Sequence, residues 1–269
     1  MTARVAVVRF PGVNCETESV RALERVGLAA EVFDWTRPAA ALAGYDAYLV
    51  PGGFSYQDRV RAGALAAKDP LMAALAAESS RGKPVLGICN GAQVLVEAGL
   101  VPDSGGVEVA LAHNRMADRV GYYARWVYVR VESSPCVFTH AMSPGTVLPL
   151  PIAHGEGRFT SAVPGRLETL AAAGQVPLRY ATLAGAIAER FPDDPNGSEA
   201  AAAAVCNAAG NVLAIMPHPE RAQELGGIAR TVAGPWGHRR EEALERGDAA
   251  AAGPGQLLFE GLRRHLEGG

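Results

Sequence analysis

The segment "KPVLGICNGAQVLVEAGL" (residues 83–100) decides the fold. Its first part is a short apolar run typical of a strand buried on both faces, and its second part has helical spacing. Between them, Gly87 and Gly91 stand two residues on either side of Cys89, in the G-x-C-x-G pattern of a nucleophile elbow. Such a turn strains the backbone at its central residue and needs small neighbours. The segment therefore predicts a strand, a sharp turn that presents Cys89, and a helix.

Strand-like runs and helical patterns alternate before this segment. The predicted strands are "RVAVVRF" (4–10), "AAEVFDW" (29–35) and "YDAYLVPGG" (45–53), and the predicted helices are "CETESVRALERVGL" (15–28) and "RAGALAAKDPLMAALAAESSRG" (61–82), the latter interrupted before Pro70. This alternation is typical of parallel strands joined by helices. It predicts an α/β fold, with an open, mainly parallel sheet and helices on both faces.

The second half of the chain has more strand-like runs and little helix between them. These runs are "RWVYVRVE" (125–132), "PCVFT" (135–139) and "GTVLPLPIAHG" (145–155), followed by a hairpin over residues 200–220 that turns at Ala209-Gly210. They predict a mixed or antiparallel extension of the sheet. Residues 234–255 predict an exposed helix with a flexible connector, and residues 256–269 an amphipathic terminal helix. We expect one domain over residues 1–269.

Composition excludes several classes of function. A net charge of −3 gives no electrostatic basis for binding nucleic acid or an anionic membrane. No apolar run approaches the roughly 20 residues that span a bilayer, and the N-terminus lacks the pattern of a signal peptide. The four cysteines lie far apart, with no pair at metal-ligand spacing. These features predict a cytoplasmic protein with reduced thiols and no metal. Besides Cys89, the cysteines are expected to be structural.

Cys89 is the predicted nucleophile. The N-terminus of the following helix favours the thiolate, and the backbone N–H of Asn90 would face the same pocket as an oxyanion donor. A second donor is predicted in "VPGGFSYQD" (50–58), where a strand ends in two glycines. Because glycine lets the backbone approach a ligand closely, Gly53 is the preferred candidate.

Two His-x-Glu pairs compete for the role of base. His218 and Glu220 follow the unbroken apolar run "NVLAIM" (211–216), at the carboxyl end where α/β sheets place their sites. Residues two apart on an extended segment point to the same side, so Glu220 can orient His218. His154 and Glu156 in "PIAHGEGRF" (151–159) instead follow a run with two prolines, which is unfavourable for a central strand. These arguments favour the pair at 218 and 220.

Together these motifs resemble the class I glutamine amidotransferases, which have a flavodoxin-like fold. "FPGVNC" (10–15), "GGFSY" and "AHGEGRF" make the chain most similar to the glutaminase subunits of phosphoribosylformylglycinamidine synthase, of purine biosynthesis. The resemblance implies that Cys89 is the nucleophile, His218 the general base and acid, and Glu220 its orienting carboxylate. It places Gly52, Phe54 and Gln93 near the bound glutamine. We further hypothesise that His154, Glu156 and Arg158 form a loop beside the glutamine pocket or the synthetase contact.

The resemblance also implies a reaction and partners. Attack of the thiol on the amide of L-glutamine would release ammonia and leave a glutamyl thioester, which water hydrolyses. The ammonia would pass to a large ATP-dependent synthetase subunit, with a small third subunit in the complex. Mg-ATP belongs to that synthetase, and no cofactor or metal is expected in this chain. Gln57 and Arg59 depart from the family pattern, and residues 223–254 are expected to be an insertion.

Two other functions fit the same motifs. A free-standing Cys-His hydrolase, acting on γ-glutamyl compounds or peptides, would use the same elbow and base. "AHGEGRF" and the lack of a substrate domain weigh against it. An assembly subunit with a vestigial site is the non-enzymatic alternative. The intact set of Cys89, His218 and Glu220 weighs against that reading.

Overall fold

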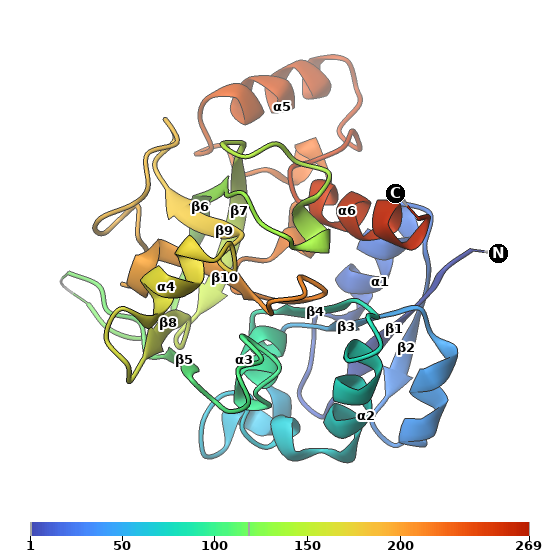
Figure 1. Ribbon diagram of the computed structural model, residues 1–269. Helices are drawn as coiled ribbons and strands as arrows, with labels where there is room; N and C mark the ends of the chain where they lie inside the picture. The colour runs from blue at the N-terminus through green and yellow to red at the C-terminus, as the bar shows by residue number, and fades with distance from the viewer. Residues whose placement is uncertain (1, 118, 269) are drawn as a thin grey trace.

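A nine-stranded mixed sheet runs through the protein (Figure 1). The computed structural model describes residues 2–117 and 119–268. In order across the sheet, the strands are β2 (Ala29–Asp34), β1 (Arg4–Arg9), β3 (Ala47–Val50), β4 (Val85–Ile88), β11 (Val212–Ile215), β10 (Ala202–Cys206), β9 (Leu178–Ala181), β6 (Tyr123–Val131) and β7 (Val147–His154). The strands from β2 to β11 pair in parallel, and the pairs from β11 to β7 are antiparallel. The predicted parallel sheet with an antiparallel extension is confirmed.

Helices cover both faces of the parallel part. Figure 1 shows α1 and α6 on one side and α2 and α3 on the other. The α-helices are α1 (Glu16–Arg25), α2 (Pro70–Ser79), α3 (Asn90–Glu97), α4 (Arg166–Ala172), α5 (Pro235–Glu245) and α6 (Gln256–Leu266). The short 3-10 helices are η1 (Ala39–Gly44), η2 (Ser55–Asp58), η3 (Ala66–Lys68), η4 (Val137–Thr139), η5 (Glu199–Ala201), η6 (Pro219–Arg221) and η7 (Leu225–Gly227). No helix in the described part of the chain has both the length and the apolar character needed to cross a bilayer.

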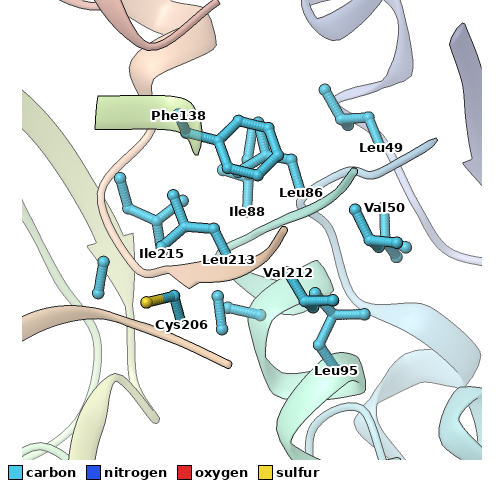
Figure 2. Packing of buried hydrophobic residues seen from close by; sticks show 14 of the residues in the cluster. Leu49, Val50, Leu86, Ile88, Leu95, Phe138, Cys206, Val212, Leu213 and Ile215 are labelled. Atoms are coloured by element: carbon cyan, nitrogen blue, oxygen red, sulfur yellow. The ribbon is translucent and has the colours of Figure 1, made fainter. Parts of the chain in front are cut away.

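The core lies on both faces of the central strands, where the four residues of β4 are all buried. Figure 2 shows Phe138 on one face, over Leu86 and Ile88. Leu95 of α3 lies on the other face, near Val212. Side chains on both faces are fully buried, which explains why these strands are continuous apolar runs rather than alternating ones. This packing fixes β4 and β11 side by side, with their carboxyl ends at one edge of the sheet.

Some elements differ from the prediction. Residues 135–139, predicted as a strand, contain η4 instead, and Phe138 there packs on the core. The predicted helix over 61–82 is interrupted before Pro70 as expected, where Asp69 caps α2 by accepting a hydrogen bond from the Leu71 N–H at 2.9 Å, but its first part contains only the three-residue η3. A separate two-stranded sheet of β5 (Val109–Ala112) and β8 (Arg158–Ser161), together with α4, was not predicted.

Two features of the second half agree with the sequence. β10 and β11 form the predicted hairpin, and β7, the run with two prolines, is at the edge of the sheet. The predicted helix of residues 234–255 is α5, which stands apart from the sheet in Figure 1. The segment after α5, which was predicted to be a flexible connector, is instead held by hydrogen bonds from the N–H groups of Leu225 and Gly226 to the carbonyls of Ala251 and Ala249.

Candidate active site

Cys89 occupies a strained turn between β4 and α3. Its backbone has φ 52° and ψ −105°, a conformation that residues other than glycine rarely adopt. The flanking glycines are required by close contacts: a Cβ on Gly91 would lie 1.8 Å from the Val50 carbonyl oxygen, and one on Gly87 would lie 2.6 Å from that of Gly91. The sequence pattern thus folds as a nucleophile elbow that holds the thiol at the N-terminus of α3.

His218 and Glu220 lie together at the carboxyl end of β11. His218 Nδ1 donates a hydrogen bond to Glu220 Oε1 at 2.6 Å, and both residues are buried. Nε2 is therefore free to take up a proton. Burial opposes protonation of His218, but the Glu220 carboxylate and the thiols of Cys89 and Cys15 raise its pKa well above the usual range. A base of this kind beside Cys89 can hold the thiol proton while the sulfur acts as a nucleophile.

The Gly52–Phe54 segment adjoins both of these groups. A Cβ on Gly52 would lie 2.9 Å from His218 Cε1 and 3.6 Å from Cys89 Cβ. Gly53 has a φ of 147°, and its segment is anchored by hydrogen bonds from the Phe54 N–H to the Gly12 carbonyl and from the Asn14 N–H to the Gly52 carbonyl. Gly53 and Phe54 line the pocket that contains Cys89. The donor roles of Gly53 and Asn90 toward an oxyanion stay predictions.

His154 reaches the same pocket from the end of β7, but none of the carboxylates in residues 2–117 and 119–268 is its partner. Its Nδ1 lies 3.1 Å from Asn114 Oδ1, which also accepts a hydrogen bond from the Gly157 N–H. Since Asn114 Oδ1 can only accept, Nδ1 carries the proton and Nε2 is a bare acceptor. Burial, followed by the nearby His218, lowers the pKa of His154 to about 3. His154 is thus a buried neutral imidazole, and Glu156 Oε1 instead lies 3.6 Å from His113 Nδ1.

The remaining predicted site residues are close to this pocket. Gln93 and Glu156 line it, and Gln93 Nε2 donates a hydrogen bond to the Glu156 carbonyl at 2.7 Å. Arg158 instead begins β8, where its Nε donates to the His113 carbonyl at 3.1 Å. His154 and Glu156 are therefore placed beside the nucleophile, whereas Arg158 supports the neighbouring backbone.

Known proteins of one family match this chain. The family described as CobB/CobQ-like glutamine amidotransferase domain matches residues 2–265. Phosphoribosylformylglycinamidine synthase subunit PurQ of Methanothrix thermoacetophila is 41% identical over 271 residues, which cover 98% of this chain and 98% of that protein. The chain belongs to the PurQ family. The PurQ subunit of Thermus thermophilus is 45% identical over 219 residues, 81% of this chain and 89% of that protein.

A solved relative has the same fold. A chain in the structure of PurLQS from Thermotoga maritima is 30% identical, covers 99% of this chain and 100% of its own, and superposes with a TM-score of 0.74. The agreement extends over the parallel sheet and its antiparallel extension, because the match includes nearly the whole chain. The fold and the family resemblance expected from the sequence are confirmed.

Cys15 is a residue of the PurQ pocket that the sequence analysis assigned to structure alone. It lies beside His218, lines the same pocket as Cys89, and accepts a hydrogen bond from Arg221 Nη2 at 3.0 Å. "FPGVNC" served only to identify the family. Its position after β1, at the carboxyl edge of the sheet, is the signal that could have located Cys15 in the site. Asp58 is a second pocket residue without a predicted role.

The potential ligands of a metal ion here are Cys15, His218 and Glu220, whose ligand atoms lie within 4.8 Å of one another. Their contacts do not fit a cation. The Glu220 carboxylate already accepts from His218 Nδ1, and the Arg221 guanidinium directs a positive charge at Cys15 Sγ. These groups are better explained as parts of a thiol and imidazole site than as a metal centre.

Replacing Gly91 with alanine is expected to destabilise the PurQ fold by about 4 kcal/mol or more, because the new Cβ would overlap the Val50 carbonyl. Urea denaturation of the purified chain measures the change in the free energy of unfolding. The matched control is Gly44→Ala, where a Cβ meets nothing within 4 Å. The free energy of unfolding of this control should stay within about 0.5 kcal/mol of that of the parent protein. Equal stabilities for the two variants would contradict the tight packing of the elbow.

Proposed function

We propose that this chain is the glutaminase subunit of phosphoribosylformylglycinamidine synthase. The observation that carries the proposal is the contact of His218 with Glu220 beside Cys89 on its elbow, in a chain 41% identical to a PurQ subunit. The PurQ relatives are named as subunits of that synthase. L-Glutamine is the substrate, and glutamate and ammonia are the products.

The chemistry follows from the positions of these groups. His218 Nε2 takes the thiol proton, and the sulfur of Cys89 attacks Cδ of the glutamine side chain. The N–H groups of Gly53 and Asn90 stabilise the oxyanion that forms. The proton on His218 moves to the amide nitrogen, the C–N bond breaks, and ammonia leaves. Water activated by the same imidazole then hydrolyses the glutamyl thioester and regenerates the thiol.

The ammonia has to reach its acceptor without mixing with water, where it would be mostly protonated. We therefore propose that it passes to a large synthetase subunit that uses Mg-ATP to convert formylglycinamide ribonucleotide to formylglycinamidine ribonucleotide. A small third subunit completes the complex, which is supported by the Thermotoga relative, solved as PurLQS. The chain itself uses no cofactor, acts in the cytoplasm and is one domain, with residues 223–254 as an insertion.

Co-purification from the host tests this function. The expected result is a large ATP-binding synthetase subunit that elutes with the chain, and a complex that aminates formylglycinamide ribonucleotide with glutamine and ATP. The alternative is a free-standing Cys-His hydrolase on the same fold. High activity of the isolated chain on γ-glutamyl peptides, with no synthetase partner, would support the alternative and contradict the proposal.

A further inference from the structure

Two thiols line the pocket, and the proposed reaction uses only one of them. Cys89 is the nucleophile, whereas Cys15, from the loop after β1, takes part in no step. Both side chains line the pocket, and both interact with His218. The other two cysteines, Cys136 and Cys206, are fully buried in the core. Cys15 is therefore a nucleophilic side chain beside the site that the glutaminase chemistry does not explain.

Gly52 leaves the space between these two cysteines open. A Cβ on Gly52 would lie 3.1 Å from Cys15 Sγ and 3.6 Å from Cys89 Cβ, so a larger residue would stand between the two side chains. The Cys15 N–H donates a hydrogen bond to the Gly52 carbonyl at 3.2 Å, which holds the loop after β1 against this glycine. The two sulfurs can approach each other over Gly52, where no side chain separates them.

The contacts of Cys15 also differ from those of a structural cysteine. Arg221 Nη2 donates a hydrogen bond to Cys15 Sγ at 3.0 Å, and Cys15 Sγ donates one to Asn14 Oδ1 at 3.3 Å. A guanidinium beside a sulfur stabilises the negative charge that the sulfur carries when it attacks. Reactive cysteines have cationic neighbours of this kind, whereas structural cysteines in apolar surroundings are inert. These contacts therefore indicate a chemical role for Cys15.

We propose that Cys15 is a resolving thiol, which forms a disulfide with Cys89 after hydrogen peroxide has oxidised the nucleophile. His218 takes the proton of Cys89, and the sulfur attacks one oxygen of the peroxide. The O–O bond breaks, the leaving oxygen takes the proton from His218 and departs as water, and Cys89 becomes a sulfenic acid. The Cys15 sulfur then attacks the sulfur of Cys89, the S–O bond breaks, and the Cys15 proton leaves with the hydroxyl as a second water. Two thiols are oxidised to one disulfide, and one peroxide is reduced to two waters.

The disulfide would block the nucleophile without destroying it. A sulfenic acid that is not trapped is oxidised further to a sulfinic acid, which ordinary thiols do not reduce. A disulfide is opened again by exchange with a thiol. The site has to admit water to hydrolyse the thioester, so hydrogen peroxide, which is only slightly larger, can reach Cys89 in the same pocket. Cys15 thus makes inactivation by peroxide reversible.

Mass spectrometry of both cysteines tests this proposal. The purified complex is treated with excess hydrogen peroxide, the remaining thiols are blocked with iodoacetamide, and the chain is digested with trypsin without a reductant. The parent should give the Cys15 and Cys89 peptides joined by a disulfide. Its glutamine-dependent activity should be lost and should return almost fully with dithiothreitol. In Cys15→Ser, Cys89 should carry a sulfinic acid, and dithiothreitol should restore less than about a tenth of the activity that this variant has before treatment.

Cys136→Ala is the matched control, because it removes a thiol from the core and leaves both pocket cysteines in place. It should form the same disulfide and recover like the parent. A parent in which Cys89 becomes a sulfinic acid while Cys15 stays a free thiol would overturn the proposal. Equal recovery of the parent and Cys15→Ser would also overturn it. The disulfide is detected from peptide masses, so a parent complex that does not hydrolyse glutamine before treatment would contradict the proposed function alone.

Discussion

Cys89→Ala is expected to reduce glutamine hydrolysis by about 10⁶-fold, to the background, because it removes the thiol that the elbow presents beside His218. Synthesis from added ammonia by the assembled complex should persist, since that route bypasses the thiol. The measurement compares the rates of amination with glutamine and with ammonium chloride in the same preparation. Alanine is smaller than cysteine and adds no polar group, so the elbow should remain folded.

The control for this substitution is Cys136→Ala, which removes a fully buried thiol from the core rather than from the pocket. It should retain glutamine-dependent synthesis. A stoichiometric burst of labelling by a glutamine-analogue electrophile should occur with the control and disappear with Cys89→Ala. If the Cys89→Ala complex used glutamine at the parent rate, the assignment of the nucleophile would be wrong.

His218→Ala and His154→Ala are expected to differ by several orders of magnitude. Loss of His218 removes the base and should cost about as much as loss of the nucleophile, roughly 10⁶-fold in kcat. His154 is neutral and is held by Asn114, and its ring contacts no carboxylate in the part of the chain that the structure describes. Its loss removes one hydrogen-bond acceptor, and we expect a decrease of about 10- to 100-fold in kcat/KM for glutamine.

Acid quenching with radiolabelled glutamine separates these outcomes. The His154→Ala enzyme should still accumulate a labelled glutamyl thioester, and the His218→Ala enzyme should not. The matched pair controls for the loss of a buried imidazole, because both rings are almost completely buried. The reverse result, with a thioester only in the His218→Ala enzyme, would mean that His154 is the base.

The sequence was most informative where one local rule decided the structure. Gly87 and Gly91 predict the elbow because nothing larger fits there, and the unbroken run before His218 predicts a strand buried on both faces. The prolines of β7 likewise exclude a central position, and β7 is at the edge. In each case the residues that decide the structure are close together in the sequence, so a local pattern is enough to predict it.

The features that the sequence analysis missed depend on contacts between distant segments. β5 and β8 are only four residues each, and they pair across about 50 residues of chain, which no local pattern encodes. The difference between the two histidines is set by Asn114, a residue without a recognisable motif. Cys15 enters the site because the loop after β1 is hydrogen-bonded to Gly52. Such placements follow from tertiary packing, so the local sequence could not predict them.

Gly52 lies between two thiols, and this affects how chemical labelling is interpreted. A Cβ there would lie 3.1 Å from Cys15 Sγ and 3.6 Å from Cys89 Cβ, so a single glycine separates the nucleophile from a second sulfur. A bulky adduct on either sulfur would fill the same space and exclude glutamine. Inactivation by a general alkylating reagent therefore does not identify the nucleophile. The modified peptide has to be sequenced before the lost activity is attributed to one cysteine.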